Sequence, residues 1–174
     1  MKQGIEFFTA TCLNWQPLLS ADAHKQIVLD SLTFLVKDRR IWLYGYVIMP
    51  NHIHVLWCKQ PEWLNKNVQQ HFAKFTAQQL KFSLLQNPAE LETYRSRQND
   101  RQYQFWERRP HIATMYNRIV FEEKLDYIHM NPVKANLCDL PELYEFSSAP
   151  TTAQMLKMKS LLTIWNTYNP VVVR

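Results

Sequence analysis

The chain carries the stretch Trp42-Leu43-Tyr44-Gly45-Tyr46-Val47-Ile48-Met49-Pro50-Asn51-His52-Ile53-His54-Val55-Leu56-Trp57. Apolar and aromatic residues on both sides of the Pro50-Asn51 pair indicate two strands joined by a tight turn or bulge. Because side chains alternate along a strand, His52 and His54 point to the same face. Two neighbouring imidazoles on an apolar strand indicate a site for a divalent metal ion.

Strand and helix patterns alternate on both sides of this stretch. The expected strands cover residues 5–15, 41–49 and 52–59, with a fourth around 104–106 or 111–115, and the expected helices cover residues 21–36, 61–85 and 118–131. The segment 86–102 is polar and without periodicity, so we expect a mobile loop there. We expect Pro132 to end the last of these helices or to follow it directly.

This order of elements is that of the split β-α-β plan. The expected fold class is therefore α+β: a ferredoxin-like, mostly antiparallel sheet with helices packed on one face. The histidine pair would then lie on a central strand. The length of 174 residues suits one domain, which we place at residues 1–149. A C-terminal extension at residues 150–174 follows, with a short helix expected over 151–165.

Composition narrows the class of protein. No apolar run reaches the roughly 18 residues of a membrane span, and the N-terminus lacks the pattern of a secretory signal. Cys12, Cys58 and Cys138 are odd in number and far apart, which is typical of reduced thiols, so we expect a cytoplasmic protein with no membrane partner. The net charge of +5 suits a polyanionic partner without establishing one.

The expected helix over 118–131 carries two polar residues of chemical interest. Tyr127 and Asn131 are four residues apart and share a helical face, beside the apolar stripe that faces the sheet. A side-chain amide oxygen can ligate a hard cation, and a phenol can act as a nucleophile.

Four segments, taken together, resemble a known family. The segment from Tyr44 to Leu56 resembles the histidine-hydrophobic-histidine (HUH) signature of the REP-associated tyrosine transposases, and Tyr127-Ile128-His129-Met130-Asn131-Pro132-Val133-Lys134 resembles their tyrosine helix. Between them, Phe105-Trp106-Glu107-Arg108-Arg109 resembles the aromatic-basic segment of the family, and Tyr144-Glu145-Phe146-Ser147-Ser148-Ala149 its closing motif. Pro110 and His111 depart from the pattern, in which Phe usually follows the basic pair.

The resemblance implies a function. His52 and His54 would be metal ligands for Mg²⁺ or Mn²⁺, and Asn131 would occupy the place of a third ligand. Tyr127 would be the nucleophile of a single-strand DNA nicking and joining reaction near hairpins, with a covalent 5′-phosphotyrosine intermediate. Such a transposase would work on single-stranded or hairpin DNA, as a monomer or as a homodimer.

Basic residues with interleaved aromatics are the candidates for holding DNA. The basic candidates are Lys74, Lys81, Arg95, Arg97, Arg101, Arg108, Arg109 and Lys134. The aromatic candidates for stacking on bases are Tyr94, Tyr103, Phe105 and Trp106. For Trp106 we favour a place in the sheet or core over a stacking role.

Other readings of the same residues stay open. The strand histidines could be core residues, Tyr127 a rim tyrosine, Asn131 a helix-ending residue and the basic side chains a solvated surface. We expect His129 at the surface, and His24, His71 and His111 to be structural or solvent-facing. As a whole, the chain could be a non-catalytic binding module for structured single-stranded nucleic acid, or a hydrolase that uses metal and water.

Overall fold

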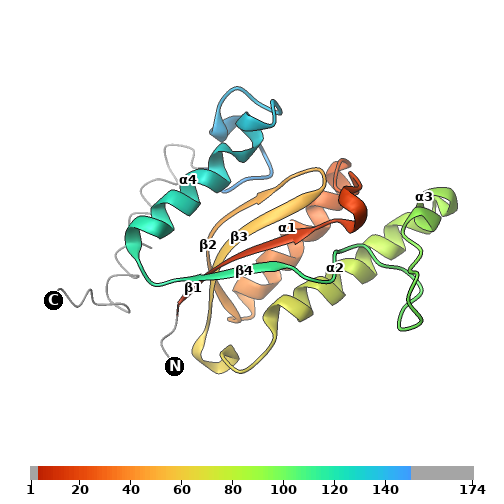
Figure 1. Cartoon of the computed structure of the whole chain (residues 1–174), viewed down its shortest axis with the longest axis horizontal. Helices are drawn as coiled ribbons and strands as arrows, with labels where there is room; N and C mark the ends of the chain where they lie inside the picture. Colours follow the sequence, from red (N-terminus) through yellow and green to blue (C-terminus); the bar gives the residue numbers. More distant parts are fainter. Residues whose placement is uncertain (1–3, 150–174) are drawn as a thin grey trace.

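The computed structural model describes residues 4–149, which form an antiparallel sheet with helices on both faces (Figure 1). The strands are β1 (Ile5–Thr11), β2 (Ile41–Ile48), β3 (His52–Lys59) and β4 (His111–Met115), in the spatial order β2-β3-β1-β4. The helices are α1 (Asp22–Lys37), α2 (Val68–Leu84), α3 (Pro88–Thr93) and α4 (Arg118–Lys134). Short 3-10 turns are η1 (Leu13–Trp15), η2 (Pro61–Trp63) and η3 (Pro141–Leu143).

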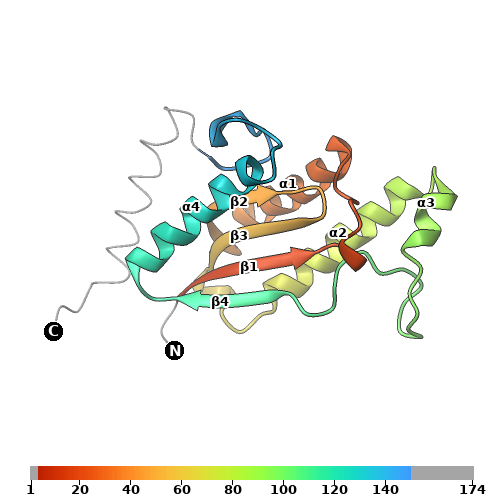
Figure 2. The ribbon, with the colours of Figure 1, turned by 45° about the horizontal axis from the view of Figure 1, so that its top comes forward.

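The alternation of side chains along the strands produces two apolar layers. On β3, Ile53, Val55 and Trp57 join the larger core beneath α1 and α2. Leu56 points to the other face, into a smaller core with Phe121 and other residues of α4. The predicted α+β class with an antiparallel sheet is confirmed. Helices α1 and α2 share one face as expected, whereas α4 lies on the opposite face (Figure 2).

Several element boundaries differ from the expected ones. The first strand ends at Thr11, because residues 13–15 form η1 with a left-handed backbone. The fourth strand is β4, and Trp106 forms only an isolated bridge with Cys12. The segment 86–102 contains α3, which begins with Pro88 in its first turn, a position that needs no N–H donor.

Pro132 does not end α4, which runs on to Lys134. A proline removes its own hydrogen bond to the carbonyl four residues before it, and here that bond falls in the last turn of the helix. The prediction that the helix ends at Pro132 is therefore wrong. The expected helix over 151–165, and the extension that contains it, lie outside the described residues.

A C-terminal strap over residues 146–148 covers the free edge of β2 and also contacts α4. The backbone N–H of Ile48 donates to the carbonyl of Phe146 (2.9 Å), and that of Ser148 donates to Tyr46 (2.9 Å). The Ser148 hydroxyl also lies 3.1 Å from His129 Nε2. His129 is buried, so the expectation that it lies at the surface is wrong. The strap holds α4 and β2 together.

Gly45 lets α4 approach β2 closely. A Cβ atom on Gly45 would lie only 2.6 Å from Leu125 Cδ1, well inside van der Waals contact. We predict that Gly45→Val lowers the free energy of unfolding by about 1–3 kcal/mol through overpacking, measured by urea denaturation. In a Leu125→Ala background the same substitution should have a smaller effect, because the clashing methyl is gone. Equal effects in both backgrounds would contradict this account of the contact.

Candidate active site

The strand register places three polar side chains in one row on the α4 face of the sheet. His54 of β3 lies opposite Thr9 of β1, and Thr9 lies opposite His111 of β4. His52 lies two residues before His54 on the same face, and the centroids of the two imidazole rings are 4.7 Å apart. The predicted pairing of the two rings on one face of a central strand is present in the structure.

Tyr127 comes to this row from α4. Its ring centroid lies 5.3 Å from that of His54 and 6.1 Å from that of Phe7. The phenol is half-exposed, with 39% of Tyr127 accessible to solvent. The structure therefore brings the tyrosine and the histidine pair together within one copy of the chain.

Hydrogen bonds indicate which imidazole nitrogens carry protons. His52 Nδ1 lies 2.7 Å from the carbonyl oxygen of the Asn51 side chain, which can only accept, so Nδ1 donates. His54 Nδ1 lies 2.7 Å from the Thr9 hydroxyl. Within residues 4–149, His54 Nε2 is buried and has no hydrogen-bond partner. A buried polar nitrogen without a partner is uncommon, and a binding or catalytic role is one explanation for it.

The residues around this nitrogen fit a divalent cation. Asn131 forms a side-chain hydrogen bond with His52, so its amide lies beside the imidazole pair. In the described part of the chain, no group of three or more His, Cys, Asp or Glu side chains converges on a metal position. Two imidazoles and one amide would leave several positions for water or phosphate oxygens, as Mg²⁺ and Mn²⁺ prefer.

Burial keeps both imidazoles neutral. It lowers the pKa of His52, and the hydrogen bond with Asn131 acts against this shift. Burial also lowers the pKa of His54 to about 3, with further lowering by the charges of His52, Lys124 and His111. Metal binding needs neutral imidazole, so this protonation state would suit a cation at neutral pH.

Two ammonium groups flank the phenol. Lys124 Nζ lies 5.5 Å and Lys134 Nζ 5.6 Å from the centroid of the Tyr127 ring. Lys134 was among the predicted basic residues, but Lys124 was not. Its position three residues before Tyr127 puts it on the same helical face, a signal that could have identified it. Thr9 and His111 could not be identified in this way, because they reach the site only through the strand register.

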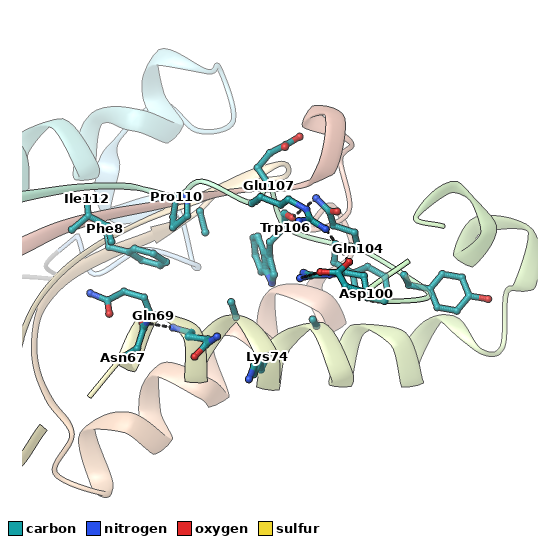
Figure 3. Close-up of a pocket in the computed structure, with 18 residues that line it drawn as sticks. Phe8, Asn67, Gln69, Lys74, Asp100, Gln104, Trp106, Glu107, Pro110 and Ile112 are labelled. Carbon is teal, nitrogen blue, oxygen red and sulfur yellow. Dashed lines mark hydrogen bonds and ion pairs between the residues drawn. The ribbon is translucent and has the colours of Figure 1, made fainter. Parts of the chain in front are cut away.

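Four of the seven remaining predicted basic residues line two cavities. Arg108 and Arg109 line a small cavity next to His52. Lys74, Arg101 and Arg108 line a larger cavity of ≈ 670 Å³ between α2 and the segment that carries Asp100 and Glu107 (Figure 3). This larger cavity also includes Phe8 and Ala10, whose side chains belong to the α1/α2 layer, so it opens on the face opposite the histidines.

The other three predicted basic residues are Lys81, Arg95 and Arg97, and they line neither cavity. Lys81 and Arg95 flank the Tyr103 ring, and Arg95 also pairs with Glu92 at 2.6 Å. Arg97 is exposed. Of the predicted DNA-binding residues, Lys134 lies beside the Tyr127 ring, and Arg108 and Arg109 line the cavity beside His52.

Three of the four aromatic candidates for stacking on bases belong to the core. Tyr94, Phe105 and Trp106 are buried, and Trp106 donates its indole N–H to the Thr76 hydroxyl at 3.0 Å. Burial in the core excludes base stacking by Tyr94 and Phe105, so these two candidates are wrong, whereas Trp106 has the core position that the sequence favoured. Tyr103 is half-buried beside Lys81.

Comparison with known proteins identifies the fold. No family model matches the sequence, and no curated protein matches it. A solved structure described as a REP-associated tyrosine transposase bound to a REP hairpin aligns with a TM-score of 0.62, over 86% of this chain and 78% of that one, at 19% identity. The chain shares the fold of that transposase. Within residues 4–149 of this chain, none of the helices has the length and apolar character needed to span a membrane.

The pKa of His54 predicts how stability depends on pH. In the unfolded chain this imidazole takes up a proton near its ordinary pKa of 6.5, whereas in the folded chain it does so only near pH 3. Between these values the unfolded state binds more protons, so the free energy of unfolding falls as the pH falls, by up to about 1.4 kcal/mol per pH unit for one histidine.

We predict that His54→Gln, compared with the wild type by urea denaturation in EDTA from pH 7 to pH 4, shows a shallower loss of stability. The difference between the two curves isolates His54 from the carboxylates that titrate in the same range. His71→Gln, at an exposed position outside the site, is the matched control. Identical curves for wild type and His54→Gln would contradict the burial of a neutral imidazole.

Proposed function

We propose that this protein is a metal-dependent single-strand DNA endonuclease and strand-transfer enzyme of the transposase type. It nicks and rejoins DNA near hairpins through a covalent 5′-phosphotyrosine intermediate. The observation that carries the proposal is the position of the Tyr127 ring, 5.3 Å from an imidazole whose Nε2 is buried without a partner among the described residues. The fold shared with a transposase bound to a REP hairpin supports hairpin DNA as the substrate.

His52, His54 and Asn131 would hold Mg²⁺ or Mn²⁺. When bound, the ion supplies positive charge to a non-bridging oxygen of the scissile phosphate and to the leaving 3′ oxygen. Thr9 positions His54, because its hydroxyl engages Nδ1 and so would leave Nε2 to hold the ion. Asn51 has the same effect on His52. Since both imidazoles are neutral, they would leave the full charge of the ion available to the phosphate.

Tyr127 would supply the nucleophile. Its phenolic oxygen attacks phosphorus and loses its proton, the bond between phosphorus and the 3′ oxygen breaks, and that oxygen leaves as a 3′-hydroxyl. Lys124 and Lys134 lie beside the ring and stabilise the negative charge that develops on the phenolic oxygen. The phosphotyrosine keeps the energy of the phosphodiester, so transfer to another 3′-hydroxyl reverses the step without a further energy source.

DNA would cross the α4 face of the sheet. Positive charge would lie on both sides of the reacting phosphate. Lys134 supplies it beside Tyr127, and Arg108 and Arg109 supply it beyond His52. The other predicted basic residues (Lys74, Lys81, Arg95, Arg97 and Arg101) would contact parts of the hairpin farther from the nick. Tyr127 lies by the histidines of its own chain, so we propose that a monomer holds a complete site.

The decisive experiment is a search for the covalent intermediate. A hairpin oligonucleotide with single-stranded flanks, labelled at its 3′ end, is incubated with the protein and Mn²⁺ and resolved on a denaturing gel. We predict a labelled protein–DNA adduct for the wild type, no adduct for Tyr127→Phe, and none in EDTA. Tyr116→Phe, at an exposed tyrosine away from the histidines, should form the adduct normally.

Other outcomes would replace the proposal. An adduct with Tyr127→Phe would assign the nucleophile to another residue. Free DNA ends with multiple turnover and no adduct would make water the nucleophile. Tight hairpin binding that survives chelation, with no cleavage under any metal, would make the protein a binding module.

A further inference from the structure

Trp15 is a large aromatic side chain that the fold leaves open to solvent beside the candidate site. It is 62% exposed, and its ring centroid lies 5.9 Å from that of His52. Together with Thr11, Glu107, Arg108 and Arg109 it lines a cavity of ≈ 380 Å³. That size falls in the range of roughly 300–1,000 Å³ typical of small-ligand sites.

The backbone holds Trp15 in a conformation that local preference disfavours. Trp15 has φ 57 and the preceding Asn14 has φ 53, so both are in the left-handed region. Asparagine tolerates this region, but a bulky side chain is seldom found there. No residue of η1 is buried, so the strain does not serve to bury the indole in the core.

Hydrogen bonds from both neighbouring segments keep this turn in place. The backbone N–H of Asn14 donates to Glu107 Oε1 at 2.8 Å, and that of Leu13 donates to the carbonyl of Phe105 at 2.8 Å. Just before the turn, the N–H of Cys12 donates to the carbonyl of Asn51 at 2.8 Å. The indole is therefore presented on a rigid support that is bonded to the turn leading into the histidine strand. Strain maintained in this way is typical of functional positions.

Positive charge accompanies the indole. Arg108 pairs with Asp100 at 2.9 Å, which fixes its guanidinium. Arg109 is exposed, and within residues 4–149 it forms no ion pair. An open aromatic face next to a free guanidinium matches a nucleotide, whose base stacks and whose phosphate accepts two hydrogen bonds from arginine.

We propose that Trp15 stacks on an unpaired nucleobase of the DNA strand next to the scissile phosphate, and that Arg109 binds the phosphate of that nucleotide. The cavity adjoins His52, so a strand that reaches the histidine pair passes over it. Trp15 takes the role that the buried Phe105 and Trp106 cannot perform. The inference rests on the proposed function to the extent that the strand must be DNA.

Binding measurements separate this inference from the chemistry. All variants are made in a Tyr127→Phe background, so that no cleavage occurs. Affinity is measured by fluorescence anisotropy for a DNA hairpin oligonucleotide with single-stranded flanks on both sides, and for the same hairpin without flanks. Trp15→Ala should weaken binding of the flanked hairpin about 5- to 150-fold, the effect of one stacked base. Trp15→Ala should leave the affinity for the hairpin without flanks unchanged.

Two variants serve as controls. Trp15→Tyr keeps an aromatic face and should retain most of the affinity. Phe34→Ala removes an exposed aromatic side chain on α1, on the other side of the sheet, and should bind both probes as the parent does. Thermal unfolding of each variant confirms that the fold is intact.

The outcomes are distinguishable. Undiminished binding of the flanked hairpin by Trp15→Ala, or an equal loss for both probes, would overturn the stacking role while the proposed function stands. Binding of neither probe by the parent protein would reject the proposed function and the inference with it. Crosslinking of 5-iododeoxyuridine in the flank to the peptide that contains Trp15 would support the stacking directly.

Discussion

The packing of α4 across β2 and β3 is the contact on which the candidate site depends. Gly45 has no side chain, and Leu125 fills the space that a Cβ atom would take. On the other side of the helix, His129 contacts the Ser148 hydroxyl, which also accepts from the backbone N–H of Tyr46. These contacts set how far the helix lies above the sheet. The sheet in turn carries the imidazoles, so the same contacts set the separation of Tyr127 from His54.

The candidate site lowers the stability of the fold at His54. A buried polar atom without a partner costs roughly 1–3 kcal/mol, and within the described residues His54 Nε2 is such an atom. The rest of the ring is well supported, since Phe7 stacks on it at a centroid distance of 5.3 Å and Thr9 engages Nδ1. A core histidine selected for stability alone would have both nitrogens bonded. The rule that buried polar atoms have hydrogen-bond partners is broken where the proposed cation would bind. Such exceptions are typical of functional positions.

Much of this arrangement follows from short-range patterns in the sequence. The spacing of His52 and His54 predicts a shared face, because strand side chains alternate. The spacing of Tyr127 and Asn131 predicts a shared helical face, and the order of elements predicts the antiparallel sheet. The first two features depend only on the period of a strand or a helix, the third on the order of the elements, and the structure contains all three.

Features that depend on tertiary contacts could not be predicted in this way. Thr9 and His111 join the site only because β1 pairs with β3 on one side and β4 on the other. The position of α4 opposite α1 and α2 depends on which face of the sheet its apolar stripe covers. Phe105 looks like a base-stacking residue in sequence, yet the core buries it. Trp15 looks like the end of a strand, yet hydrogen bonds that the backbone N–H groups of Asn14 and Leu13 donate to Glu107 and Phe105 hold the segment as an exposed turn.

The central claim is that one cation binds between the paired imidazoles, within reach of the phenol. Its most direct measurement is an anomalous difference map at the manganese edge, from crystals of the whole chain grown with Mn²⁺. The account predicts a single strong peak in coordination contact with Nε2 of both His52 and His54, on the side that faces Tyr127. Manganese bound elsewhere, with both Nε2 atoms engaged in ordinary packing and the Tyr127 hydroxyl turned away, would contradict it.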